Sequence, residues 1–212
     1  MKGTTSEGKP AGVATPKQAG ETQVEWSWVE RSVWTDRMLA ALVTGVKGGK
    51  WFSLMDKVYS MKNLRAAWAA VHQRKGAAGV DGQTVHRFEA RADLELAKLE
   101  QELGDGSYVP RSVKRVQIPK PGSRETRPLG IPTVRDRVVQ TALRNVLEPI
   151  FEVRFAPTSY GFRPKRGCKD ALRRVQELLD TGHTWVVDAD IRKYFEAATH
   201  YTPFTREASG RG

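Results

Sequence analysis

The sequence predicts an α+β protein that is mostly helical and has short antiparallel strands. Apolar residues recur at helical spacing in four segments, at 64–71, 88–103, 138–147 and 171–179. Alternating apolar and polar residues at 116–118, followed by a Lys-Pro-Gly turn, are typical of a strand. The helical repeat and the strand alternation of apolar residues together predict this α+β class.

The first 50 residues are expected to form a disordered or weakly structured leader. Residues 1–22 are rich in Gly, Thr, Pro and Lys and have almost nothing to bury. Three tryptophans then stand among apolar neighbours, which fits a short helix or a docking segment ahead of a glycine loop. They are Trp26, Trp28 and Trp34. We expect the folded part to begin near Trp51.

Two helices are expected between residues 51 and 107. The first repeats apolar residues from Leu64 to Val71, with Asn63 as its N-cap. A glycine-rich loop, GAAGVDG (76–82), follows it. The second helix ends at a Gly-Asp-Gly turn, and its apolar positions are Phe88, Ala92, Leu96, Leu99 and Leu103.

Two more helices and a strand are expected later in the chain. A helix begins at Thr133, whose hydroxyl caps the turn that holds Asp136. Pro149 should kink or end this helix, because proline lacks the backbone N–H that a helix interior needs. Another helix spans 171–179, and the apolar run 185–187 (Trp-Val-Val) then predicts a buried strand.

Positive charge is concentrated in one part of the chain. The 212 residues carry a net charge of +11, yet the segment Tyr108–Val175 alone has 16 Lys and Arg against 5 Asp and Glu. The remainder has 19 of each sign and is neutral. Such a concentration attracts polyanions, since phosphates that are neutralised release their counterions. The alternative is a solvated basic surface, but that usually spreads charge along a chain, so nucleic-acid binding is favoured.

Several kinds of chemistry are excluded by composition. Cys168 is the only cysteine, so neither an intrachain disulfide nor a cysteine-based metal cluster can form. No apolar run approaches the ~18 residues of a membrane span, and the polar start lacks a signal-peptide apolar region. A cytoplasmic protein without a membrane partner is the expectation.

Asp188 and Asp190 follow the expected strand directly, in the run WVVDAD. Alternate residues of a strand point to the same face, so both carboxylates are placed together. Carboxylates at a strand end beside a basic surface suit Mg²⁺, which takes one or two protein carboxylates and otherwise water and phosphate oxygens. The alternative is that they only form a turn.

Two basic segments offer contacts for nucleotides or nucleic acid. Lys120, Arg124 and Arg127 surround a Gly/Pro turn in the segment 118–132, where a hairpin tip could close over a triphosphate. An ordinary charged hairpin tip is the alternative.

The segment 159–167 (SYGFRPKRG) interleaves aromatic rings with cations, which suits stacking beside phosphates. Alternatively, its two rings belong to the core at a loop end. Its residues of interest are Tyr160, Phe162, Arg163, Lys165 and Arg166. Further on, the ring of Phe195 could pack under an incoming sugar and exclude a 2′-hydroxyl, or lie in the core.

Four segments, in this order, resemble the opening blocks of group II intron reverse transcriptases and maturases. GAAGVDGQTV (76–85) resembles the N-terminal extension block of the family, and the segment 115–152 resembles its first block. FAPTSYGFRPKRGCKDAL (155–172) resembles the second block, and WVVDADIRKYFE (185–196) resembles the opening of the third. Four blocks in register make this resemblance highly specific.

The resemblance implies a right-hand polymerase with fingers at about 76–180 and a palm that begins near 184. Asp190 matches the first catalytic aspartate, a Mg²⁺ ligand, and the backbone of Ile191 reaches toward the metal. Phe195 matches the aromatic residue that selects deoxynucleotides.

The remaining matches concern phosphate and RNA contacts. Arg127 and Lys120 match cations that hold the deoxynucleoside triphosphate, whereas Arg124 is expected to bind RNA or template. The block at 155–172 is implied to contact an RNA template–primer, and the loop at 76–82 to touch template or intron RNA.

The pattern departs from the family after Glu196, and no adjacent Asp-Asp pair occurs in the chain. We therefore expect a chain truncated before the Tyr-Ala-Asp-Asp block, with an incomplete palm and no polymerase activity alone. Two other hypotheses remain: a non-catalytic RNA-binding module that uses its basic fingers, and a remnant without function. The expected domains are a leader at 1–50, a helical extension at 51–107, basic fingers at 108–183, the start of the palm at 184–196 and a divergent tail at 197–212.

Overall fold

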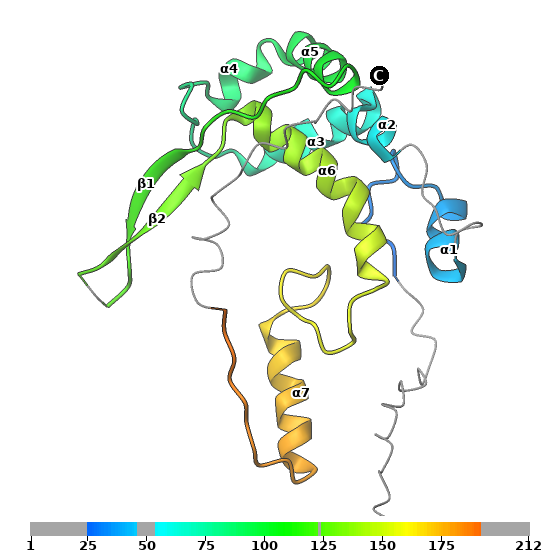
Figure 1. Ribbon diagram of the computed structural model, residues 1–212, viewed down its shortest axis with the longest axis vertical. Helices are drawn as coiled ribbons and strands as arrows, with labels where there is room; N and C mark the ends of the chain where they lie inside the picture. The colour runs from blue at the N-terminus through cyan, green and yellow to red at the C-terminus, as the bar shows by residue number, and fades with distance from the viewer. Residues whose placement is uncertain (1–24, 46–53, 123, 192–212) are drawn as a thin grey trace, which may run out of the picture. The chain divides into compact units, whose positions relative to one another are not determined.

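One long helix, α6 (Val134–Glu152), organises the larger part of the fold and packs against α1, α2, α3 and α5 (Figure 1). The computed structural model describes residues 25–45, 54–122 and 124–191 and divides the chain into two units, Met1–Ser159 and Tyr160–Gly212. The expectations for residues 1–22 and for Phe195 lie outside the described residues.

The first unit contains the elements from α1 to α6. In chain order they are α1 (Asp36–Thr44), α2 (Leu54–Tyr59), α3 (Met61–Arg74), α4 (Val85–Glu89), α5 (Ala92–Gly104), β1 (Lys114–Pro119), β2 (Thr126–Ile131) and α6. The helix expected over 88–103 is thus two helices, α4 and α5, which are separated by two residues. The helix N-cap expected at Thr133 is confirmed, because its hydroxyl accepts a hydrogen bond from the N–H of Asp136 at 3.1 Å.

The core of this unit lies between these helices. It is built from the expected apolar positions of α3, α5 and α6, including Leu64, Leu96 and Val138, each at most 1% exposed. Residues of the leader also belong to it, since Trp34 is 0% exposed. The folded part therefore begins before Trp51, earlier than expected, and the short helix considered for this region is α1.

Trp34 also explains why α6 continues past Pro149. In a regular helix the N–H of residue 149 would donate to the carbonyl of Asn145, and proline has no N–H. The indole N–H of Trp34 donates to this carbonyl instead, at 2.9 Å. The helix extends three residues beyond Pro149 to Glu152, so the expectation that proline ends it is wrong.

Asn63 was expected to cap α3, but it does not. The N-cap is Ser60, and Asn63 lies in the first turn, 0% exposed. Its amide donates to the carbonyls of Lys57 at 2.9 Å and Ala142 at 3.0 Å. Its oxygen accepts from the side chain of Asn145 at 3.0 Å. A buried amide is stable only when its polar atoms are paired, and here they join α3 to α6.

The hairpin of β1 and β2 extends away from these helices (Figure 1). The strands are antiparallel, with Val116 opposite Leu129 and Ile118 opposite Arg127. Every residue of the two strands is exposed except Ile118 and Ile131, which are partly exposed. The strand and turn expected here are confirmed, and the fold combines helices with a two-stranded antiparallel sheet.

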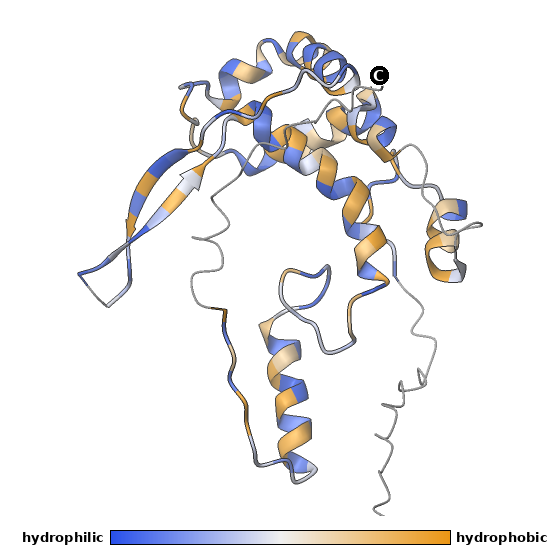
Figure 2. Cartoon of the chain, in the orientation of Figure 1, coloured by the Kyte–Doolittle hydropathy of each residue, from blue (hydrophilic) through white to orange (hydrophobic). Residues whose placement is uncertain are grey.

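The second unit contains one described helix, α7 (Cys168–Asp180), as expected from its periodicity. Apolar and polar residues alternate around it (Figure 2), yet no residue of α7 is buried. The run 185–187 is not the predicted buried strand: it has no strand pairing, and Trp185 is 95% exposed. A strand forms only where another strand supplies hydrogen-bond partners, and none of the described residues does so here.

None of the helices in the described ranges combines the length and the apolar character that crossing a membrane requires.

Candidate nucleic-acid interface

The hairpin cations lie at the surface, where a polyanion can reach them. Arg124 and Arg127 are exposed, and Lys120 forms an ion pair with Glu125 across the turn, with 2.6 Å between Nζ and Oε2. Arg127 shares a ribbon face with Ile118, whereas Arg115, opposite Gly130, lies on the other face. The hairpin therefore presents positive charge on both of its faces rather than on one.

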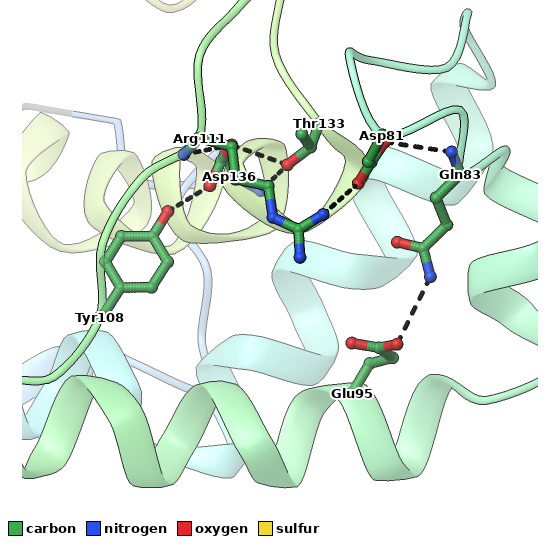
Figure 3. Close-up of polar contacts among 7 residues, drawn as sticks. All are labelled: Asp81, Gln83, Glu95, Tyr108, Arg111, Thr133 and Asp136. Atoms are coloured by element: carbon green, nitrogen blue, oxygen red, sulfur yellow. Dashed lines mark hydrogen bonds and ion pairs between the residues drawn. The ribbon is translucent and has the colours of Figure 1, made fainter.

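Asp136 fixes the base of this hairpin to the helices (Figure 3). This carboxylate is 3% exposed and accepts a hydrogen bond from the hydroxyl of Tyr108 at 2.6 Å. It also accepts from the hydroxyl of Thr133 at 2.7 Å and from the N–H of Arg111 at 3.2 Å. Because Arg111 precedes β1 and Thr133 follows β2, one buried carboxylate holds both ends of the hairpin.

Tyr108 is itself part of the packed interior. Burial, together with its hydrogen bond to Asp136, raises the pKa of the Tyr108 phenol well above its usual range. The guanidinium of Arg135 lies over the ring, 5.5 Å from its centroid, and also forms an ion pair with Glu102 on α5. The hydroxyl therefore stays protonated and donates to the carboxylate at all ordinary pH values.

The GAAGVDG loop is held close to the start of α6. Arg137 donates to the carbonyl of Ala77 at 2.9 Å, and desolvation by burial lowers the pKa of this arginine. A Cβ on Gly79 would lie 2.6 Å from the Cα of Thr133, so only glycine allows the loop to approach this closely. Asp81 in addition joins the loop to the segment before β1, through an ion pair with Arg111 at 3.2 Å (Figure 3).

The segment 160–167 belongs to the second unit and combines buried and exposed groups. Arg163 is 8% exposed, and the guanidinium of Arg166 lies 5.9 Å from the centroid of the Tyr160 ring. Phe162 is fully exposed at φ 56°, so the interpretation of this ring as core is wrong. Lys165 is also exposed and has φ 56°.

The metal site implied by the resemblance is not assembled by the described residues. Asp188, Asp190 and Ile191 are exposed and lie outside any strand, so the shared strand face expected for the two carboxylates is absent. Nowhere in residues 25–45, 54–122 and 124–191 do three or more His, Cys, Asp or Glu side chains gather as metal ligands. These residues alone do not fit a divalent ion, and we derive no chemical step from one.

Sequence reasoning missed two parts of this surface. The roles of Tyr108 and Arg137 had no signal, because each contacts residues about 30 to 60 positions away in sequence. Arg87 and Arg91 were also overlooked, since they lie in the part of the chain where positive and negative charges cancel. A count of charge by helix face, rather than by segment, could have found them.

Comparison with known proteins shows which family the chain resembles. The family model for reverse transcriptase (RNA-dependent DNA polymerase) matches residues 118–207. Together with a relative named as a group II intron-encoded protein and another named as a COX1/OXI3 intron protein, this match confirms the resemblance to group II intron reverse transcriptases and maturases.

The relatives come from two bacteria and from a yeast. Protein YkfC of Escherichia coli is 45% identical over 126 residues, which cover 58% of this chain and 33% of that protein. The group II intron-encoded protein LtrA of Lactococcus lactis is 38% identical over 138 residues, 64% of this chain and 22% of LtrA. The putative COX1/OXI3 intron 1 protein of Saccharomyces cerevisiae is 31% identical over 142 residues, 66% of this chain and 17% of that protein. The chain thus spans a third or less of each relative.

Proposed function

We propose that this chain is the fingers and the start of the palm of an RNA-directed DNA polymerase and intron maturase, and that alone it binds RNA without extending a primer. The observation that carries the proposal is the exposed basic hairpin, anchored at both ends by buried Asp136. A two-stranded hairpin is marginal in water by itself, so a firm attachment lets it present its cations in one place.

The hairpin also has the composition that phosphate binding requires. Arginine guanidinium groups donate two parallel hydrogen bonds to phosphate oxygens, and a hairpin tip with several cations reaches several phosphates. In the complete polymerase, Lys120 and Arg127 would hold the triphosphate of the incoming nucleotide. Arg124 and the second-unit residues Tyr160, Arg163, Lys165 and Arg166 would contact the template–primer.

The catalytic part of the proposal concerns Asp190. It would be the first of the carboxylates that hold Mg²⁺, with Ile191 and Phe195 beside the incoming deoxynucleotide. Because the described residues gather no group of three or more His, Cys, Asp or Glu side chains, at Asp190 or elsewhere, we expect no nucleotide incorporation by this chain.

Primer extension on an RNA template with Mg²⁺ tests this expectation. We expect no product from the 212-residue chain. Incorporation that is lost in Asp190→Ala would show that the chain does assemble a catalytic site and would refute the inactive part of the proposal.

RNA binding is tested separately, through its salt dependence. Binding of a labelled RNA hairpin should weaken steeply as salt rises, because phosphate contacts release counterions. The variant Arg124→Gln/Arg127→Gln should weaken binding roughly tenfold and lower the log–log salt slope by about two. The matched control, Arg37→Gln/Lys62→Gln, removes the same charge from exposed positions on α1 and α3 and should change little. Affinity that does not respond to salt would exclude a phosphate-driven mode.

A further inference from the structure

A second basic site occurs in the first unit and takes part of its positive charge from outside the basic segment Tyr108–Val175. A pocket of 630 Å³ is lined by the end of the GAAGVDG loop, by α4 and α5, and by residues at the base of the hairpin. Its carboxylates are Asp81 and Glu95. Its cations are Arg87, Arg91, Lys98, Arg111 and Arg135. The pocket thus has five cations against two carboxylates, and only Arg111 and Arg135 come from the basic segment Tyr108–Val175.

Three of these cations already face a carboxylate. Arg111 forms an ion pair with Asp81 at 3.2 Å. Arg135 and Lys98 both form ion pairs with Glu102 of α5, and the Lys98 distance is 3.9 Å. Arg87 and Arg91, in contrast, form no ion pair with any residue of the described ranges, and both are exposed. The pocket therefore holds two uncompensated guanidinium groups, one at the end of α4 and one ahead of α5.

We propose that this pocket binds backbone phosphates of a folded RNA, at a place separate from the hairpin. The inference rests on the proposed RNA-binding function and extends it to α4 and α5. Arginine is the residue best suited to phosphate, and Ala90 is the one apolar residue in the lining, so hydrophobic anchoring of a protein partner has little support. His86 also lines the pocket and adds ring nitrogens that can contact a phosphate.

Asp81 competes with a bound phosphate for the guanidinium of Arg111. Its carboxylate occupies the guanidinium of Arg111 and also accepts from the N–H of Gln83 at 3.1 Å (Figure 3). A phosphate that reaches Arg111 must share that group with Asp81. Removing the negative charge of Asp81 should therefore strengthen phosphate binding, whereas removing Arg87 and Arg91 should weaken it.

The test uses the full 212-residue chain and a fluorescein-labelled RNA hairpin, followed by fluorescence anisotropy across a potassium chloride titration. Arg87→Gln/Arg91→Gln should bind roughly tenfold more weakly, with the salt slope lower by about two. Asp81→Asn keeps the shape of the side chain and the acceptor for Gln83, and should bind several-fold more tightly. Arg37→Gln/Lys62→Gln is again the control for total charge.

The two proposals fail in different ways. If Arg87→Gln/Arg91→Gln binds like the charge control while Arg124→Gln/Arg127→Gln is weakened, the pocket inference is overturned and the hairpin proposal stands. If wild-type binding does not depend on salt, the RNA-binding function itself fails. Weaker binding by Asp81→Asn, with an unchanged circular dichroism spectrum, would contradict the competition between Asp81 and phosphate.

Discussion

The two units of this chain differ in how far the apolar side chains of their helices are buried. Leu99, an apolar residue of α5, is 0% exposed, whereas Leu172, an apolar residue of α7, is 62% exposed. Both helices have the same apolar period in sequence. The difference teaches that an amphipathic helix becomes a core element only when neighbouring elements cover its apolar face.

The largest effect expected from this contrast is on stability. Phe88→Ala should lower the free energy of unfolding by about 3–5 kcal/mol, because the ring is fully buried and lies against Trp68 with centroids 4.6 Å apart. Leu172→Ala should change it by less than about 0.5 kcal/mol, since it removes an exposed side chain. Urea denaturation of both variants measures the two values. A large loss in Leu172→Ala would mean that α7 is covered in solution, and the contrast between the units would disappear.

The next effect tests how closely the GAAGVDG loop approaches α6. Gly79→Ala should destabilise the first unit by about 1–3 kcal/mol, because the new methyl group would overlap backbone atoms of Thr133. Gly161→Ala is the control, since a Cβ there would meet nothing within 4 Å. Thermal unfolding of the two variants should separate them clearly. Equal melting temperatures would show that the loop does not rest on α6.

A smaller effect tests how the leader joins the first unit. Trp34→Phe should cost about 1–2 kcal/mol through the unpaired carbonyl of Asn145, in addition to the lost ring volume. Pro149→Ala restores a backbone N–H to that carbonyl, so the cost of Trp34→Phe should fall in its presence. A double-mutant cycle of unfolding free energies measures the coupling. Additive costs would show that the indole does not replace the missing helix hydrogen bond.

The smallest effect concerns the start of α7. The N–H of Gly167, and secondarily Arg173, lower the pKa of Asp170 below its ordinary 3.8. A carboxylate with a lowered folded-state pKa stabilises the helix above the unfolded value and loses that contribution as the pH falls through the folded value. Helical content followed by circular dichroism should therefore fall on acidification below about pH 4. Asp170→Asn should remove this pH dependence, and an unchanged acid response would refute the assignment.

Local patterns predicted most of the helices and the hairpin correctly, because propensity, capping and turn residues act over a few positions. Thr133 illustrates this success, because the hydroxyl that caps α6 bonds to Asp136, only three residues away. Asn63 and Pro149 illustrate the failures. Their roles depend on Ala142 and Trp34, which lie 79 and 115 positions away in the chain, so no local rule could assign them.

The candidate site divides in the same way. The cations of the hairpin were predictable from sequence, as was the family resemblance that gives Asp190 its proposed role. The roles of Arg87 and Arg91 in the pocket were not predictable from sequence. Nearby carboxylates in the chain balance their charge in any count along the sequence.

The sequence by itself determined the helical and strand periods, the basic segment and the four family blocks, since each of these is a property of residue order. Only the tertiary structure decided that a single buried carboxylate, Asp136, fixes the hairpin, and that two arginines of a neutral segment face a common pocket. The physical reason is that burial and charge pairing depend on distances in space, which the folded backbone sets.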